Sequence, residues 1–346
     1  MAERVVIESQ LRLGYRPATI AFGLCRPPST VLREMRRNGW RLVGKRGFRL
    51  LAGGYRAVSA DRRARQLVRK PRRLRKLVIG TELWERVTGM LRRRLSPPQI
   101  ARTLRRMPDP VRLSAETIYT TLYAMPRGAL RRELLNCMRR HHQDRRQQRR
   151  GSGARKPPIP DMILIDQRPE EINRRLVPGH WEGDMIIGKA NRSQVGVLVE
   201  RRTLFLALVR LESPRAEPAG KAFSSILNRF SSQMRRSLTY DQGSEMRHHQ
   251  RLTEDTGVEV FFAHPRSPWE RGIAENTNGL LRQYLPKAQD LSGFTQDQLD
   301  DIAWSMNVRP RKTLDWKAPA ELFLPVGDFD FVKYWSSIID PVALGS

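Results

Sequence analysis

The positive charge of this 346-residue chain is confined to its first half, which divides the chain into two parts of different character. Residues 1–158 hold 40 Lys and Arg against 10 Asp and Glu, whereas residues 159–346 hold 24 against 25. A region this basic favours a polyanionic partner, and the excess of Arg over Lys suits bidentate contacts with phosphate. The sequence therefore predicts a nucleic-acid-binding arm followed by a nearly neutral globular body.

Other classes of protein fit this composition less well. No run of about 18 apolar residues is available to span a bilayer, and the first residues lack the apolar core of a signal peptide. The two cysteines, Cys25 and Cys137, are too far apart to form a metal-ligand spacing or a disulfide framework. We therefore expect a protein of a reducing cytoplasm that binds double-stranded DNA and no membrane.

The start of the basic arm has the pattern of a helix-turn-helix domain. Short helices are expected over residues 5–13 and 18–24, and a third from a capping Ser29 to about Asn38. Its inward stripe consists of Val31, Leu32 and Met35. The residues expected to reach DNA in the major groove are Ser29, Thr30, Arg33, Arg36 and Arg37. The alternative is an ordinary helical hairpin whose arginines are only solvated.

A second, weaker helix-turn-helix pattern follows. Ser96 and Gln99 are expected to form a capping box, and Ser114 can cap a helix that continues to Tyr123. The residues expected to contact DNA here are Arg112, Ser114 and Thr117. The same helical-hairpin alternative applies. Between the two patterns, the densely basic residues 62–76 are expected to follow the phosphate backbone.

A polar, basic segment at residues 139–160 separates the arm from the body and is expected to be a linker. Its His141 and His142 have no third ligand nearby, so we interpret them as polar linker residues and not as metal ligands. The expected domains are a helix-turn-helix domain at 1–60, a second helical DNA-binding region at 61–138, this linker, an α/β core at 161–325 and a C-terminal tail at 326–346.

The body after the linker alternates between strands and helices. The β-rich runs cover residues 181–187, 194–200, 205–211, 237–240 and 258–262. The helical runs cover residues 218–230, 244–256 and 267–284. Three consecutive strands followed by strand–helix alternation predict a mixed five-stranded sheet flanked by helices. The expected fold class is therefore multidomain, with all-α arms followed by an α/β core.

Three acidic residues of the body are candidate metal ligands, namely Asp184, Asp241 and Glu275. Magnesium and similar hard cations prefer oxygen ligands. Two such ions, about 4 Å apart, can activate a hydroxyl and stabilise the leaving oxygen of a phosphodiester. The chain has no Gly-rich phosphate-binding loop ending in Lys-Ser or Lys-Thr, so we do not expect it to use ATP.

Two other glutamates compete for these roles. Glu182 shares a strand face with Asp184, about 7 Å away. Glu270 precedes Glu275, but the run from Ser267 to Glu270 is expected to form a capping box that occupies Glu270 at the helix start. Glu275 falls on the polar face of the same helix, which also contains Arg271, Asn278 and Arg282. A plain solvated face is the alternative for Glu275.

Three sequence blocks that contain these acids resemble the IS-thirty family of bacterial insertion-sequence transposases. They are PGHWEGD at 178–184, TYDQGSE at 239–245, and SPWERG at 267–272 with ENTNGLLRQYLPK at 275–287. The third block is the longest and the most specific. Asn307–Lys312 resembles the segment that follows the third acid in the family, and the 34 positions from Asp241 to Glu275 match the family's interval.

The resemblance implies a ribonuclease-H-like core of the retroviral-integrase type, in which Asp184, Asp241 and Glu275 bind two magnesium or manganese ions. It also implies a DNA transposase that binds the terminal inverted repeats of an insertion sequence and carries out metal-dependent strand cleavage and strand transfer. Such an enzyme is expected to act as a homodimer or larger assembly on DNA, associated with the nucleoid in the bacterial cytoplasm.

Further DNA contacts are expected at Arg271, Arg282, Arg309, Arg311 and Lys312. The chain departs from the family around the second acid, where Gln242 and Met246 replace the usual Asn and Phe. Two other functions remain open. One is a catalytically inactive, transposase-derived repressor that keeps only DNA binding, and the other is a nuclease with the same core.

Overall fold

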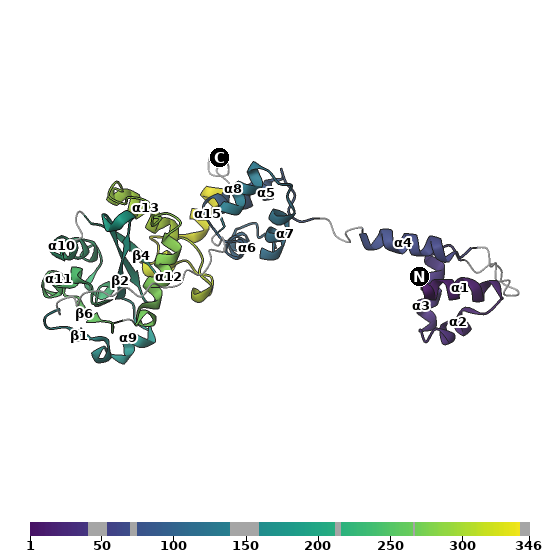
Figure 1. Ribbon diagram of the computed structural model, residues 1–346, viewed down its shortest axis with the longest axis horizontal. Helices are drawn as coiled ribbons and strands as arrows, with labels where there is room; N and C mark the ends of the chain where they lie inside the picture. Colours follow the sequence, from purple (N-terminus) through teal and green to yellow (C-terminus); the bar gives the residue numbers. More distant parts are fainter. Residues whose placement is uncertain (41–53, 70–74, 139–158, 212–215, 266, 340–346) are drawn as a thin grey trace. The chain divides into compact units, whose positions relative to one another are not determined.

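The structure, a computed structural model, describes residues 1–40, 54–69, 75–138, 159–211, 216–265 and 267–339 (Figure 1). Its contacts form two compact units, Met1–Arg75 and Lys76–Ser346, and each is considered by itself. Most of the expected linker, including His141 and His142, and part of the basic stretch at 62–76 lie outside the described residues. No described helix is both long and apolar enough to cross a membrane.

The first unit is a small helical domain. Its helices are α1 (Ala2–Arg12), α2 (Pro17–Gly23), α3 (Pro28–Arg37) and α4 (Ala57–Arg69). The three helices expected from the sequence are confirmed. The expected cap is wrong, because α3 begins at Pro28 with Pro27 as its N-cap, and Ser29 already lies inside the helix. The fixed φ angle of proline suits the first helical position, which explains the earlier start.

One face of α3 is buried and the other is basic. Val31 and Met35 are buried in the core of the unit, as the inward stripe predicts. Arg33, Arg36 and Arg37 are exposed. The basic outer face that a DNA-reading helix needs is therefore present on α3.

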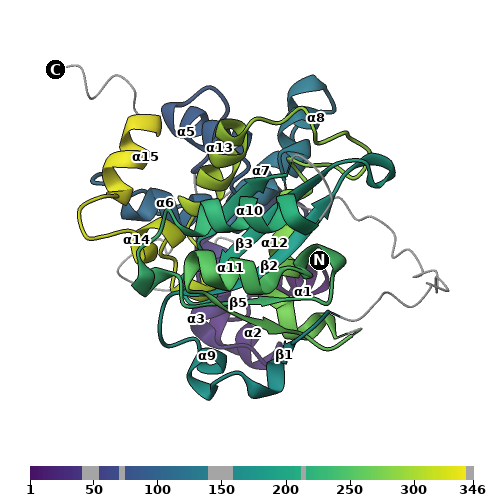
Figure 2. The same cartoon turned by 90° about the vertical axis from the view of Figure 1, so that its left-hand side faces the viewer.

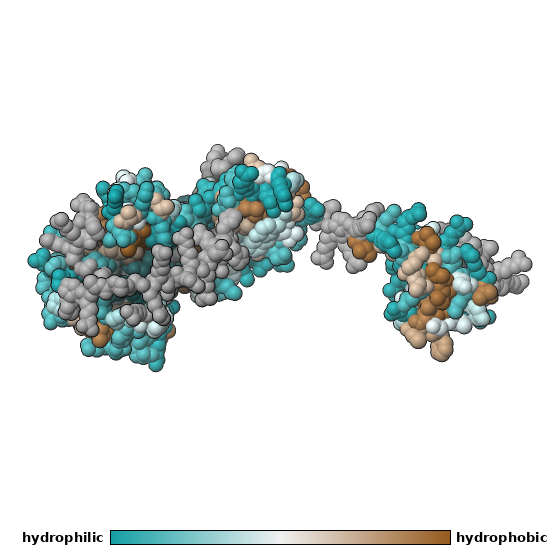
Figure 3. Space-filling view, viewed as in Figure 1, coloured by the Kyte–Doolittle hydropathy of each residue, from teal (hydrophilic) through white to brown (hydrophobic). Residues whose placement is uncertain are grey.

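Ion pairs connect the helices of this unit below its surface. The guanidinium of Arg4 in α1 lies 2.7 Å from Glu34 of α3 and 2.7 Å from Asp61 of α4. Apolar surface is also visible on this unit in Figure 3, and Leu13 and Phe22 are among its exposed apolar side chains. Glu34 and Asp61 thus help to hold α1, α3 and α4 together.

The second unit begins with a helical bundle. It contains α5 (Glu82–Arg92), α6 (Pro97–Arg106), α7 (Ala115–Ala124) and α8 (Ala129–Asn136). Both helix caps expected here are confirmed. The backbone N–H of Ser96 donates to the Gln99 side chain at 3.0 Å, and the backbone N–H of Thr117 donates to Ser114 Oγ at 3.1 Å.

The C-terminal residues complete this bundle. In the region expected to be a tail, α15 (Phe331–Ile339) inserts Phe331 and Trp335 into the core formed by α5 to α8. The bundle is also fastened to the rest of the unit. The Gln99 amide donates to the carbonyl of Pro310 at 2.9 Å, and Arg106 pairs with Glu321 at 2.5 Å. Residues 331–339 are therefore part of the folded unit.

Within the described residues, the α/β part contains one sheet of six strands. They are β1 (Ile163–Leu164), β2 (His180–Ile187), β3 (Gln194–Glu200), β4 (Leu206–Arg210), β5 (Ser237–Tyr240) and β6 (Glu259–Phe262). The strand order is β1-β6-β5-β2-β3-β4. Strands β2, β3 and β4 are antiparallel neighbours, whereas β5 is parallel to both β2 and β6.

This mixed sheet confirms the expected fold class, a helical region followed by an α/β core with a mixed sheet. All five predicted strands are present. The predicted strand count is wrong by one, because the two residues of β1 pair in parallel with β6. A strand this short shows no alternation of apolar and polar residues, so the sequence gives no signal for it.

Helices cover both faces of the sheet (Figure 2). On one face, α10 (Ala216–Leu227) and α11 (His249–Thr256) share a core with Trp181 of β2. On the other face, α12 (Gly272–Leu281) and α13 (Gln296–Asn307) share a core with Ile186 of β2. Because alternate strand residues face opposite sides of a sheet, Glu182, Asp184 and Ile186 lie on the α12 side.

Short elements complete the unit. They are α9 (Glu170–Arg174), α14 (Pro319–Phe323) and the 3-10 turns η1 (Ile165–Gln167), η2 (Lys189–Asn191), η3 (Ser232–Met234), η4 (Ser244–Met246), η5 (Pro268–Arg271) and η6 (Lys312–Leu314). Two of these turns divide helices that the sequence predicted as continuous. The run at 244–256 consists of η4 and α11, and the run at 267–284 begins with η5 before α12.

Candidate active site

Two of the three candidate acids lie side by side on neighbouring parallel strands. Strands β2 and β5 pair His180 with Ser237 and Glu182 with Thr239. Extended by two residues, this register leads from Glu182 and Thr239 to Asp184 and to Asp241, which follows the last residue of β5. Neighbouring strands are about 4.8 Å apart, so the two carboxylates share one small region of the α12 face.

A single guanidinium bridges these two aspartates. Nη1 of Arg271 lies 3.3 Å from Oδ1 of Asp184, and Nη2 lies 3.3 Å from Oδ2 of Asp241. Nη1 also donates to the carbonyl of Gly183 at 3.1 Å. Arg271 is the residue immediately before α12, so the start of this helix is directly tied to both acids.

Other donors fix the orientation of the two carboxylates. Asn278 of α12 donates to Oδ2 of Asp184 at 2.8 Å, and the backbone N–H of Met185 donates to Oδ1 at 2.8 Å. The backbone N–H of Gly243 donates to Oδ1 of Asp241 at 3.0 Å. The side-chain amide oxygen Oδ1 of Asn278 is buried and has no hydrogen-bond partner among the described residues. An oxygen ligand for a cation is therefore available beside Asp184.

Helical spacing puts Glu275 on the same side of α12 as Asn278, but the described structure does not bring its carboxylate together with the two aspartates. Arg271, Glu275 and Asn278 are separated by four and three positions, the spacing that places side chains along one face of a helix. Both of its neighbours on this face contact Asp184. The Glu275 side chain is exposed, and the described residues contain no group of three or more His, Cys, Asp or Glu side chains arranged to hold a metal ion.

The contacts of the competing Glu182 hold the fold together. It is completely buried, and its Oε2 accepts the backbone N–H groups of Ile273 and Ala274 at 3.0 Å each. Its Oε1 lies 3.2 Å from the buried guanidinium of Arg201. The first backbone N–H groups of a helix have no partner within the helix, so Glu182 satisfies two of them and fixes the start of α12 to β2.

The competing Glu270 also makes contacts that hold the fold together, but they are not the helix-capping contacts expected from the sequence. Ser267 makes no side-chain cap, so the predicted capping box is wrong. Glu270 instead accepts the backbone N–H of His264 at 2.8 Å and lies 3.0 Å from its Nδ1. The hydrogen bond with Glu270, supported by the charge of Asp166, raises the pKa of His264. Glu270 thus holds the loop after β6.

Burial and charge act in opposite directions on Asp184. Burial raises the pKa of Asp184, the nearby Arg271 guanidinium and the Met185 N–H oppose that rise, and the net shift is upward. The adjacent Gly183 is required by packing, because a Cβ atom there would lie 2.5 Å from the ring of Tyr240. In this run, Glu182 anchors α12, Gly183 allows close packing against Tyr240, and Asp184 is the candidate metal ligand.

The residues expected to contact DNA fall into three groups. Those that are exposed are Ser29, Thr30, Arg33, Arg36, Arg37, Arg112, Ser114 and Lys312. Those that are partly buried are Thr117, Arg282 and Arg311. The buried ones, which the structure removes from a DNA-contacting surface, are Arg271 and Arg309.

Arg309 illustrates why the sequence was misleading there. It is only 1% exposed, and its guanidinium donates to the backbone carbonyls of Arg93 and Arg94 and to the Tyr284 hydroxyl. These contacts join the helical bundle to the residues after α13. Burial lowers the pKa of Arg309. A basic residue in a family motif thus serves as an internal connector between the bundle and the core.

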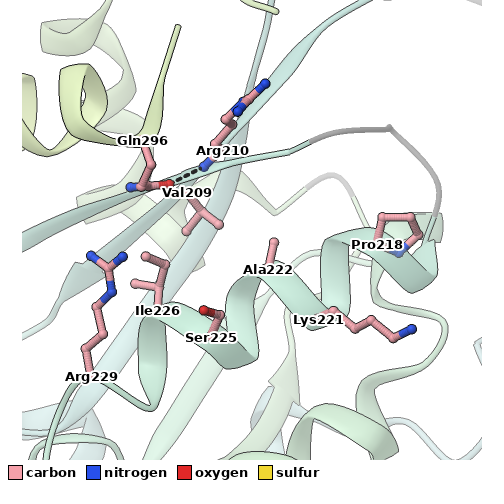
Figure 4. A pocket seen from close by; sticks show the side chains of 9 residues that line it. All are labelled: Val209, Arg210, Pro218, Lys221, Ala222, Ser225, Ile226, Arg229 and Gln296. Atoms are coloured by element: carbon pink, nitrogen blue, oxygen red, sulfur yellow. Dashed lines mark hydrogen bonds between the residues drawn. The ribbon is translucent and has the colours of Figure 1, made fainter.

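A cavity of about 610 Å³ lies away from the acids, between β4, α10 and the start of α13 (Figure 4). Its basic lining residues are Arg210, Lys221 and Arg229. The Gln296 side chain accepts the backbone N–H of Arg210 at 2.9 Å and donates to the carbonyl of Leu208 at 2.8 Å. The Gln296 amide therefore pairs one backbone N–H and one carbonyl of the edge strand β4, as a neighbouring strand would.

Comparison with curated proteins found close relatives over most of the chain, although no family model matches it. The transposase for insertion sequence element IS1086 of Cupriavidus metallidurans is 46% identical over 307 residues, which are 88% of this chain and 87% of the relative. Transposase InsI for insertion sequence element IS30A of Escherichia coli is 38% identical over 336 residues, covering 93% and 82%. The transposase for IS4351 of Bacteroides fragilis is 32% identical and covers 96% and 98%.

Solved structures show a more distant similarity. An intasome of simian T-cell lymphotropic virus in complex with PP2A regulatory subunit B56 gamma aligns with a TM-score of 0.36 at 17% identity, covering 62% of this chain and 72% of that chain. The catalytic core domain of BIV integrase aligns with a TM-score of 0.33 at 16% identity, covering 42% and 93%. On the identity and coverage of its curated relatives, this chain belongs to the IS-thirty (IS30) family of insertion-sequence transposases.

Proposed function

We propose that this protein binds the terminal inverted repeats of an insertion sequence and catalyses metal-dependent strand cleavage and strand transfer. The observation that supports this most is the placement of Asp184 beside Asp241, together with the α12 face that contains Glu275 between two residues in contact with Asp184. Family membership supports the same reaction, because the relatives are transposases of insertion sequences.

The residues around this position suit a hard divalent cation. Asp184 and Asp241 supply carboxylate oxygens, and the buried side-chain oxygen Oδ1 of Asn278 has no hydrogen-bond partner among the described residues. Such oxygen donors are the preferred ligands of magnesium and manganese. The residues that would hold the ions are Asp184, Asp241 and Glu275. Two bound ions would stabilise both the attacking and the leaving oxygen of a phosphodiester.

The chain itself supplies orientation and binding. The N–H groups of Gly243 and Met185 and the amide of Asn278 keep the aspartate oxygens directed toward α12. Buried Glu182 keeps the start of α12 in place. In the exposed arm, α3 offers Arg33 and Arg37 to the grooves and phosphates of an inverted repeat. The arm thus selects the DNA and the core holds the reacting phosphate.

The proposed reaction consists of two in-line displacements at phosphorus. A water oxygen first attacks the phosphodiester at the end of the element, the bond to the 3′-oxygen breaks, and a free 3′-hydroxyl remains. That hydroxyl then attacks a phosphodiester of the target, forming a new bond and releasing a second 3′-hydroxyl. Phosphoryl transfer depends mainly on positioning and charge neutralisation, so no covalent nucleophilic side chain is needed. Joining two ends implies a dimer or larger assembly.

An assay with labelled inverted-repeat ends and magnesium tests this proposal. We expect Asp184→Asn, Asp241→Asn and Glu275→Gln each to abolish cleavage and joining, while binding of the ends stays within a few-fold of wild type. The exposed acid Glu259 of β6 provides a control, because Glu259→Gln should leave all three measurements unchanged.

The products distinguish the alternatives. Joined strands support the transposase, nicks without joining support a nuclease, and a shifted but uncut complex supports a repressor. Loss of end binding in all three acid variants would contradict the division of labour between arm and core.

A further inference from the structure

Arg271 is the residue whose position the proposed reaction leaves unexplained. The sequence suggested a DNA contact, but its guanidinium is buried between Asp184 and Asp241, 3.3 Å from each. A third contact, with the carbonyl of Gly183 at 3.1 Å, holds it in that position. Its side chain is only 10% exposed, so the guanidinium is fixed by the protein and has little access to solvent.

The two aspartates need a counter-ion when no metal is bound. Two ionised carboxylates on adjacent strands repel each other, and the burial of Asp184 makes its charged form still less favourable. Arg271 opposes both effects, since its charge and its hydrogen bond to Asp184 both favour the ionised form. With Arg271 in place the three groups sum to one negative charge, and without it they sum to two.

We propose that Arg271 is a positioning residue that acts as an internal counter-ion: it holds Asp184 and Asp241 in register in the metal-free protein, and divalent metal must displace its guanidinium to bind both aspartates. This inference rests on the proposed function, because it assumes that the two aspartates bind metal. At the start of α12, the Arg271 guanidinium and a divalent metal would then compete for the same oxygens of Asp184 and Asp241.

The competition can be measured by metal binding, without DNA and without activity. The experiment titrates the full-length protein with manganese and follows free manganese by electron paramagnetic resonance. Arg271→Gln removes the charge, and Arg271→Lys retains it. Arg282→Gln is the matched control, because Arg282 directly follows α12 and donates to the backbone carbonyls of Ile187 at 2.9 Å and Leu285 at 3.3 Å, not to either aspartate. Asp184→Asn shows whether the manganese measured is bound at this site.

We expect Arg271→Gln to bind manganese about tenfold more tightly than wild type, or more. A full charge within about 4–6 Å shifts the proton affinity of a carboxylate by about 1–3 pK units, and metal affinity should change in the same direction. A tenfold change corresponds to about 1.4 kcal/mol. Arg271→Lys and Arg282→Gln should both stay close to wild type, and Asp184→Asn should lose the binding.

Manganese affinity of Arg271→Gln that is equal to or weaker than wild type, with the loss on Asp184→Asn intact, would overturn this inference alone. Absence of any manganese binding that depends on Asp184 would overturn the inference and the metal site of the proposed function together. A second measurement does not depend on Arg271→Gln folding. In wild type labelled with 15N-arginine, the Nε–H signal of Arg271 is the one that the Arg271→Lys variant lacks. This signal should shift when magnesium is added, and an unchanged signal would contradict displacement of the guanidinium.

Discussion

Replacing Glu182 with alanine should strongly destabilise the second unit, although this residue is an acid next to the candidate catalytic ones. The carboxylate is fully buried and accepts two backbone N–H groups at the start of α12. It also faces the guanidinium of Arg201, which is only 5% exposed. Glu182→Ala therefore removes the oxygen that accepts two backbone N–H groups and leaves the buried charge of Arg201 without this carboxylate.

The size of the effect follows from these contacts. Each buried N–H that loses its acceptor costs about 1–3 kcal/mol, and removal of one partner of a buried ion pair costs about 3–5 kcal/mol. These losses overlap, because one carboxylate makes all three contacts. We expect Glu182→Ala to lower the free energy of unfolding by about 3–5 kcal/mol, a large part of the 5–15 kcal/mol typical of a folded domain.

Equilibrium urea unfolding followed by circular dichroism measures this change. If the chain unfolds in two steps, only the step of the second unit should move. Glu182→Gln keeps an acceptor oxygen and should cost less than Glu182→Ala. Adding Arg201→Met to Glu182→Gln should recover stability, because it removes the unpaired charge. The exposed control Glu259→Ala should change stability by no more than about 0.5 kcal/mol.

Two results would refute this reasoning. A loss below about 1 kcal/mol for Glu182→Ala would show that the carboxylate does not anchor α12. A well-folded Glu182→Gln variant that no longer binds manganese would show that Glu182 is itself a metal ligand, and that the choice between Glu182 and Asp184 was wrong.

Three further predictions concern other parts of the chain. Glu270 raises the pKa of His264 above its ordinary 6.5, so their contact stabilises the fold below that pH and the gain is lost as the pH rises through the raised pKa. Glu270→Ala should therefore cost more stability in mildly acidic than in alkaline urea unfolding, and equal losses would contradict the pairing. Gly183→Ala should cost about 1–3 kcal/mol in the same measurement because its Cβ would meet Tyr240, and a neutral result would show that the ring can move. Arg33→Ala should weaken binding to inverted-repeat DNA and reduce the slope of log affinity against log salt by about 1, whereas an unchanged slope would remove Arg33 from the phosphate contacts.

The strands of the core were predictable because they are short runs rich in apolar and β-branched residues, separated by turn segments. Strands β2 to β6 all begin and end within one residue of the predicted ranges. The pair Ile163–Leu164 could not be recognised as a strand, because two residues are too few to form a strand pattern in the sequence. Their pairing depends on β6, about a hundred positions away. Local pattern thus identified the elements, whereas the long-range partner of a short segment remained hidden.

The sequence put forward Asp184 and Asp241 as candidate acids, but it gave no sign of the guanidinium that lies between them. The motifs identified Asp184 and Asp241, and the parallel register of β2 and β5 places them together. Nothing in the sequence distinguishes Arg271, buried between the acids, from an arginine on the surface. The same limit applies to Arg309, whose partners are carbonyls more than 200 positions away. The direction of a basic side chain depends on tertiary contacts that spacing does not encode.

Whether Asp184, Asp241 and Glu275 share a metal site can be determined from the position of the metal in a complex of the protein with inverted-repeat DNA. Anomalous scattering from manganese in crystals of that complex would locate the ions. We expect manganese bound by Asp184 and Asp241, with a Glu275 oxygen at about 2.1 Å, close to the metal–oxygen distance of a small divalent cation. Glu275 more than about 10 Å from both aspartates in a well-ordered complex would contradict the shared metal site and leave only DNA binding.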